Sequence, residues 1–165
     1  MEHISDDLVN ETWREVAAFT PERAHTEMTS LGNIQPSLVA FMVTFTQDID
    51  PSVKALALYW FFNIYRMFQK SFRKPIKQVS QETIEECYEY NENLIESLAD
   101  THDRFIDRIA RIQLSFQPYV MKYVVEVLYE MPEEKEDVEL SEEDTGYLFL
   151  LLKTVVESLN KTIAA

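Results

Sequence analysis

The stretch Pro51–Phe72 constrains the fold more than any other part of the sequence. Its central residues, 53–68, include only three strongly polar side chains, which are Lys54, Asn63 and Arg66. Apolar residues fall on every side of a helix drawn through it, so that helix must be a membrane span or the middle of a packed domain. A span needs about 20 apolar residues, and the polar residues inside this stretch would be costly in lipid. We therefore interpret it as the central helix of an all-α domain.

Composition agrees with that interpretation. The 165 residues suit one domain with its own core, and we expect residues 1–165 to form a single helical domain. Apolar residues make up 46% and charged residues 27%, which is typical of globular proteins. The chain has only two glycines, and because tight hairpins need glycine while helices are weakened by it, this scarcity favours helices.

Charge and cysteine content restrict the partners and the compartment. The net charge is −14, from 15 basic and 29 acidic residues. Nucleic acids and anionic membranes are bound mainly through Lys and Arg, so neither is an expected partner, whereas a protein partner is. The single Cys87 cannot form an intrachain disulfide, and the acidic N-terminal residues do not resemble a signal peptide. These features predict a cytoplasmic protein.

Capping residues and prolines divide the chain into about seven helices. Ser5, Thr20, Asp50, Ser80 and Ser141 are good N-caps, and four prolines stand at expected first helical positions. The second helix is expected to end at Gly32, because glycine commonly follows the last helical residue. The predicted helices cover about 5–19, 21–31, 36–49, 51–72, 81–116, 117–131 and 141–163, and the acidic segment 132–140 is predicted to be a solvated connector.

The predicted helix at about 81–116 is unusually long. Apolar residues recur every three or four positions along it, which is the pattern of a sustained heptad seam. Asn91 and His102 are polar positions in that seam, where such residues can fix register or partner choice. His102 has acidic neighbours and an imidazole that can titrate near neutral pH. The ordinary alternative for both is a hydrogen-bonded core or boundary residue.

Two segments that begin with Gln-Pro resemble each other. Gln35–Phe45 and Gln117–Val127 match at Gln, Pro and Val and keep similar character elsewhere, at a separation of 82 positions. Each is followed by a capped, mostly apolar helix. This similarity raises the hypothesis of two duplicated halves, 1–77 and 80–165, whose buried helices pair. The alternative is that any two amphipathic helices that start after proline look alike.

Glu22 and His25 form a Glu-x-x-His pair on a predicted helix. This spacing lets both side chains reach one divalent metal, and di-iron bundles use such a pair twice. The second pair is missing here, because Ala99 lies three positions before His102. A metal site at Glu22 and His25 is therefore a secondary hypothesis, and no other cofactor is predicted.

A basic cluster stands out in this acidic chain. It contains five of the 15 basic residues within 12 positions, namely Arg66, Lys70, Arg73, Lys74 and Lys77. The cluster lies at the C-terminal end of the central helix, where cations offset the helix dipole. It can serve that purpose and pair with acids, or it can dock an anion or an acidic partner segment.

No set of residues in the sequence predicts catalysis. The two glycines cannot build a phosphate loop, no Ser or Cys has a credible His and carboxylate pair nearby, and carboxylates beside Cys87 would raise its pKa. We therefore predict a non-enzymatic protein-interaction or scaffolding domain that forms homo-oligomers through part of the long helix. The alternatives are a metal-binding or small-ligand-binding bundle that uses Glu22 and His25, and an enzyme whose pocket is assembled in space.

Overall fold

The computed structural model describes residues 2–99, 116–130 and 140–165. Within these residues every regular element is a helix and none is a strand, so the all-α prediction is confirmed. The elements are α1 (Asp6–Ala17), α2 (Pro21–Ile34), α3 (Pro36–Phe45), α4 (Pro51–Ser71), α5 (Gln81–Ala99), α7 (Pro118–Val125), a π-helical turn η1 (Glu126–Glu130) and α8 (Glu142–Ala164).

The predicted caps begin these helices. Ser5, Thr20 and Ser141 accept hydrogen bonds through their side chains from backbone N–H groups three residues on, at 3.2, 3.2 and 3.0 Å. Asp50 accepts one from the second residue on at 2.8 Å, and Ser80 accepts one from the third at 3.1 Å. Each cap satisfies an N–H group that the helix itself leaves unpaired.

The predicted end of the second helix is wrong. Helix α2 continues through Gly32 to Ile34, and no glycine in the described part of the chain has a positive φ. The helix ends instead at Gln35, whose φ of −133° and ψ of 63° lie outside the helical region. Pro36 explains this, because the residue before a proline is disfavoured in the α conformation.

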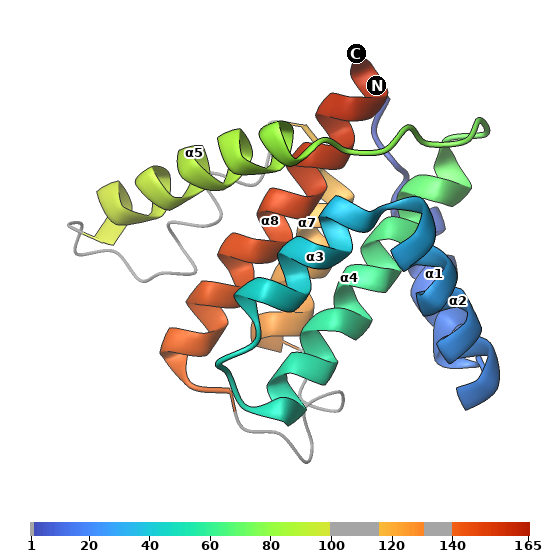
Figure 1. The fold of residues 1–165 in the computed structure, drawn as a ribbon, viewed down its shortest axis with the longest axis horizontal. Helices are drawn as coiled ribbons and strands as arrows, with labels where there is room; N and C mark the ends of the chain where they lie inside the picture. Colours follow the sequence, from blue (N-terminus) through green and yellow to red (C-terminus); the bar gives the residue numbers. More distant parts are fainter. Residues whose placement is uncertain (1, 100–115, 131–139) are drawn as a thin grey trace.

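Helices α4 and α8 form the centre of the bundle (Figure 1). Every residue from Trp60 to Tyr65 is buried, and so is every residue from Leu148 to Val156. The two helices pack against each other, which confirms the predicted buried pair. No helix in the described ranges is long and apolar enough to cross a bilayer.

The remaining helices surround this pair in two matching sets. Helix α1 packs on α4 and α5 packs on α8, while α3 lies between α4, α8 and α5, and α7 lies between α8, α4 and α1. Figure 1 shows α5 crossing α8 near the upper end of the bundle, with α1 and α2 on the opposite side of α4. Helix α5 also packs on α3.

Two glutamines that precede prolines connect distant segments. Gln35 accepts a hydrogen bond from the N–H of Val79 and donates one to the carbonyl of Lys77, both at 2.9 Å. Gln117 accepts from the N–H of Ile4 at 2.9 Å and donates to the carbonyl of Glu2 at 3.1 Å. Each glutamine thereby holds the extended segment that leads into α5 or α1.

The predicted long helix is described only in its first part. Helix α5 is present to Ala99, and residues 100–115, which include His102, lie outside the described residues. The same holds for residues 131–139 and so for nearly all of the acidic connector. The predicted helix after Gln117 is present as α7, and its last turn is the π-helical η1.

Candidate functional site

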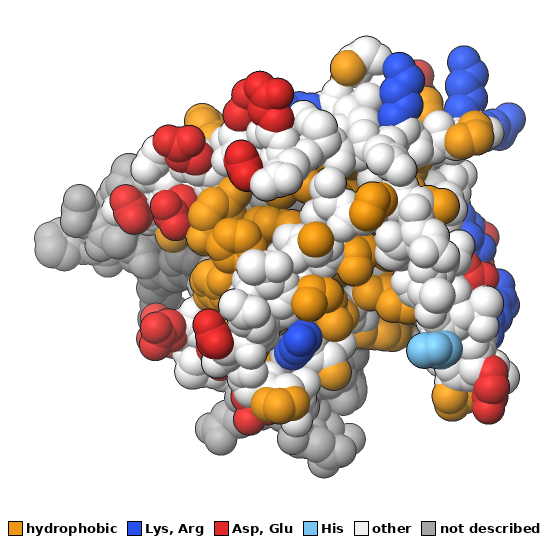
Figure 2. Space-filling model, in the orientation of Figure 1, with side chains coloured by type: hydrophobic (Ala, Val, Ile, Leu, Met, Phe, Trp, Pro, Cys, Tyr) orange, Lys and Arg blue, Asp and Glu red, His pale blue; other side chains and the backbone are white. Residues whose placement is uncertain are grey.

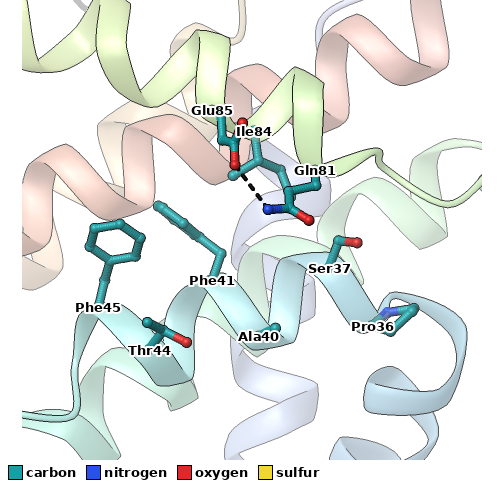
Figure 3. Close-up of a pocket in the computed structure, with 9 residues that line it drawn as sticks. All are labelled: Pro36, Ser37, Ala40, Phe41, Thr44, Phe45, Gln81, Ile84 and Glu85. Atoms are coloured by element: carbon teal, nitrogen blue, oxygen red, sulfur yellow. Dashed lines mark hydrogen bonds between the residues drawn. The ribbon is translucent and has the colours of Figure 1, made fainter.

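A groove runs along α3, and its first part is an apolar hollow of about 350 Å³ between α3 and α5. Figure 3 shows Phe41 and Ile84 projecting toward each other across it, with Ala40 on the α3 side. Gln81 donates a hydrogen bond to Glu85 at 2.9 Å on its α5 side. The lining residues are Pro36, Ser37, Ala40, Phe41, Thr44 and Phe45 from α3 and Gln81, Ile84 and Glu85 from α5.

Aromatic packing fixes the shape of this apolar hollow. The rings of Phe41 and Phe45 are 4.9 Å apart, and Tyr88 on α5 lies 5.9 Å from the first and 4.9 Å from the second. Such tilted and edge-on ring contacts are favourable beyond the area they bury. The three rings therefore pack α3 against α5 beside the apolar hollow.

The second part of the groove is an acidic hollow of about 490 Å³ at the end of α3. It shares Thr44 and Phe45 with the apolar hollow, so the two parts adjoin along α3. Its other lining residues are Gln47, Asp48 and Ile49 after α3 and Glu143, Asp144 and Tyr147 from the first turns of α8. We call the two hollows together the α3 groove.

Acidic side chains dominate the charge of the α3 groove. Four carboxylates line it, namely Glu85, Asp48, Glu143 and Asp144, whereas no lysine or arginine does so in the described part of the chain. Figure 2 shows hydrophobic side chains gathered between α5 and α3, with acidic side chains along α5 and at the start of α8. The groove therefore combines an apolar floor with a negative rim.

The two tyrosines at the groove are held as neutral phenols. Burial, and then Glu92, raise the pKa of Tyr88 to about 12. Burial, followed by Asp48 and Glu92, also raises the pKa of Tyr147, whose hydroxyl donates to the carbonyl of Phe45 at 2.7 Å. Phenols with raised pKa values are neutral hydrogen-bond donors at neutral pH.

Exposed apolar side chains flank the groove helices. Tyr90 on α5 is 58% exposed and Val43 on α3 is 40% exposed. Single exposed apolar residues are common, but these two stand on the same helices as the apolar hollow. Neither one lines the groove, however, and the ring of Tyr90 faces α8, where it lies 5.8 Å from the ammonium of Lys153.

A further hollow of about 350 Å³ lies between the α1–α2 connection and α4. It is lined by Val16, Ala17, Phe19, Ala24, Met28, Leu58, Tyr59 and Phe62, none of which is charged. Nothing in the structure indicates what covers it. Its lining residue Ala24 is exposed and does not line the α3 groove.

The predicted metal pair lies on the surface. Glu22 and His25 are both exposed in the first turns of α2. No group of three or more His, Cys, Asp or Glu side chains placed to hold a metal occurs in the described ranges. Two exposed ligands alone leave most of a metal's coordination positions to water.

The basic cluster divides into a paired and an unpaired part. Lys70 donates to Glu15 at 2.8 Å and to Glu11 at 3.2 Å, and Arg66 lies 3.2 Å from Glu15. The hydrogen bond from Lys70 is the largest cause of the lowered pKa of Glu15. The other three residues are exposed and form no ion pair with any described carboxylate, namely Arg73, Lys74 and Lys77.

Asn91 lies in a buried polar cluster that the sequence did not reveal. Its side chain accepts from Lys153 and donates to Thr154 at 3.2 Å. Lys153 is only 3% exposed, and its ammonium also lies 3.3 Å from Glu157. The heptad seam predicted Asn91 as a polar position, whereas Lys153 belonged to no predicted site. His102, the second predicted seam residue, lies outside the described residues.

Cys87 lies close to this polar cluster. The thiol is fully buried, and burial is the main reason why its pKa is raised. The nearby Ser158 hydroxyl acts in the opposite direction, although the two groups do not meet ordinary hydrogen-bond geometry. A buried thiol with a raised pKa is a poor nucleophile.

Comparisons of the chain with protein-family models, with curated proteins and with solved structures each give no match. The geometry of the α3 groove is therefore the strongest functional signal. The sequence missed this groove because its residues come from three separated segments, α3, α5 and α8. The residues that line it were predicted only as helix faces.

Proposed function

We propose that this chain is a non-enzymatic protein-interaction domain that binds a partner polypeptide in the α3 groove. The observation that carries the proposal is an apolar floor made by Phe41 and Ile84, bordered by four carboxylates and open to solvent. Grooves between helices that combine apolar anchoring positions with a charged rim are a recurring mode of peptide recognition.

The chemistry of the described residues supports binding over catalysis. The groove contains carboxylates and neutral phenols but no histidine or cysteine. The buried thiol of Cys87 is protonated and enclosed. The metal alternative at Glu22 and His25 has less support, because both residues are exposed and no third ligand joins them within the described ranges.

Self-association and a cytoplasmic location are further parts of the proposal. The free, reduced Cys87 fits a reducing compartment. Homo-oligomers would use part of the predicted long helix, and Tyr90 is the most exposed large apolar residue of its described part, α5. Native mass spectrometry of the purified protein measures the oligomeric state directly.

The groove is tested by blocking it without disturbing the core. Ala40 is exposed and lines the apolar hollow, so Ala40→Arg fills the hollow and leaves the helix intact. Ala24→Arg is the matched control, with the same change of charge at an exposed position in the other hollow. Affinity capture from the source cells, with identification by mass spectrometry, is then compared for wild type and both variants.

We expect at least one identified protein to be retained by wild type and Ala24→Arg and to be lost with Ala40→Arg. Circular dichroism checks that both variants are folded. If every captured protein is retained equally by the two variants, the groove is not the binding surface and the proposed function is wrong.

A further inference from the structure

The distribution of charge along the α3 groove identifies the class of partner. We propose that the groove binds a basic amphipathic α-helix of another protein, an inference that rests on the proposed function. The apolar hollow would take the apolar side chains of that helix, and the acidic hollow would face its Lys and Arg residues.

The apolar hollow has the form that a helix face requires. Its walls are two helices, α3 and α5, and side-chain rows of a third helix pack into the groove between two others. Helix α3 has 10 residues, so the apolar hollow that runs along it is about 15 Å long at 1.5 Å per residue. Apolar anchors at positions i, i+3 or i+4, and i+7 cover about 10 Å of helix and fit this length.

The acidic hollow gives the charge of the partner. Asp48, Glu143 and Asp144 converge at the end of α3, and none of them forms an ion pair with any described Lys or Arg. Glu85 adds a carboxylate at the apolar hollow, where its only described hydrogen bond is from Gln81. Unpaired carboxylates beside an apolar floor favour a cationic partner and repel an anionic one. The net charge of −14 adds long-range attraction for the same partner.

A helical partner explains the groove better than an extended strand or a second copy. Strand addition needs an exposed sheet edge, and no strand occurs in the described ranges. A second copy would bring the same negative charge. Among its described basic residues without an ion pair, Arg73, Lys74 and Lys77 lie in the non-helical segment 72–80. The two others, Arg14 on α1 and Lys54 on α4, stand singly on their helices, so the described residues present no basic helix face.

The test uses a fluorescein-labelled designed peptide of about 16 residues, long enough to span the groove as a helix. Its apolar residues follow helical spacing and its other positions are Lys. Two control peptides keep its length, one with the apolar residues in scrambled order and one with Glu in place of Lys. Fluorescence anisotropy titrations with the full chain measure the affinity of each peptide at low and high salt.

Matched protein variants separate the groove from general charge attraction. The groove variant carries Asp48→Asn, Glu143→Gln and Asp144→Asn. The control variant carries Asp7→Asn, Glu22→Gln and Glu130→Gln, which remove the same charge at exposed positions outside the groove. Ala40→Arg and Ala24→Arg are measured alongside them, and sedimentation velocity of each protein without peptide reports self-association.

We expect the basic helical peptide to bind wild type at least about tenfold more tightly than either control peptide, and more weakly at high salt. Ala40→Arg and the groove variant should each weaken binding about tenfold, whereas Ala24→Arg and the control variant should change it less than about twofold. Equal losses for both triple variants, or equal binding of the Glu peptide, overturn the inference. A dimer of the wild type that Ala40→Arg abolishes also overturns it, because the occupant is then a second copy, while the proposed function stands.

Discussion

The α1–α4 interface of the first half and the α5–α8 interface of the second half differ in where they put their polar groups. Arg66 and Lys70 of α4 meet Glu11 and Glu15 of α1 at the rim, where the side chains stay partly exposed. In the second half, by contrast, Lys153, Asn91 and Thr154 are bonded together in the buried interior. The α1–α4 interface thus has its polar contacts at the partly exposed rim, whereas the α5–α8 interface has hydrogen bonds in its buried interior.

Residues at the same positions along α4 and α8 show this difference in polar contacts. Asn63 and Thr154 are both the thirteenth residue of their helices, as counted from Pro51 and Glu142. Thr154 accepts from Asn91, whereas the amide of Asn63 is buried and makes no hydrogen bond within the described residues. Lys153, one position earlier, corresponds to the apolar Phe62. At these two positions the second half therefore has a buried polar network, whereas the first half has the apolar Phe62 and the amide of Asn63.

The two glutamines relate the halves in a different way. Gln35 of the first half holds the segment before α5, and Gln117 of the second half holds the segment before α1. The exchange is reciprocal, as expected for two units related by a pseudo-twofold axis. The internal duplication remains a proposal, which these reciprocal hydrogen bonds favour.

The largest expected effect is in the buried network of the second half. Lys153→Met removes the ammonium while keeping much of the side-chain volume, and leaves Glu157 and Asn91 without their shared partner. Because losing one member of a buried charged pair is costly, we expect a loss of about 3 kcal/mol in the free energy of unfolding. Urea denaturation followed by circular dichroism measures it.

The matched change in the first half is Arg66→Met. Its pair with Glu15 is partly exposed, so the expected loss is only about 0.5 kcal/mol. If Arg66→Met and Lys153→Met lower the free energy of unfolding equally, the partly exposed and the buried polar contacts do not differ in their contribution to stability.

The next effect tests the reciprocal glutamines. Gln35→Met and Gln117→Met keep side-chain length and leave one buried N–H group, of Val79 or Ile4, without its partner. Leaving such a group unpaired costs about 1–3 kcal/mol, so about 2 kcal/mol is expected for each variant. Thermal unfolding and urea denaturation should give similar values for the two. If only one of the two variants is destabilised, the two glutamines do not play the same structural role, and this result would count against the duplication.

The smallest effect concerns the Glu15–Lys70 pair at the rim of the first half. The pKa of Glu15 is lowered in the folded protein, chiefly by the Lys70 hydrogen bond. Its contribution to stability is therefore present above the unfolded pKa, near 4.5, and is lost as the pH falls through the folded pKa. Lys70→Met should cost less than about 1 kcal/mol at neutral pH.

The same difference should shrink toward zero as the pH falls below the lowered pKa of Glu15. The measurement is a set of urea titrations of wild type and Lys70→Met across the acidic range. A difference that stays constant through the titration of Glu15 would mean that packing of the lysine stem, rather than its charge, supports the interface.

Local chemistry determined much of this protein. The caps at Ser5, Thr20 and Ser141, the proline-defined helix starts and the buried character of α4 and α8 all follow from side chains within one turn or one helix. Gly32 was the exception, because a glycine signal for a helix end was overridden by Pro36 four residues later, where the backbone restriction is stronger.

Contacts between residues far apart in sequence could be seen only in the tertiary structure. The hydrogen bonds of Gln35 with Lys77, of Gln117 with Glu2 and of Lys153 with Asn91 each join residues more than 40 positions apart in sequence, so no local pattern indicated them. The α3 groove likewise depends on where α5 crosses and where α8 begins. Helix formation is governed by short-range backbone and side-chain preferences, whereas a groove or a buried ion pair exists only when separate helices meet at one place.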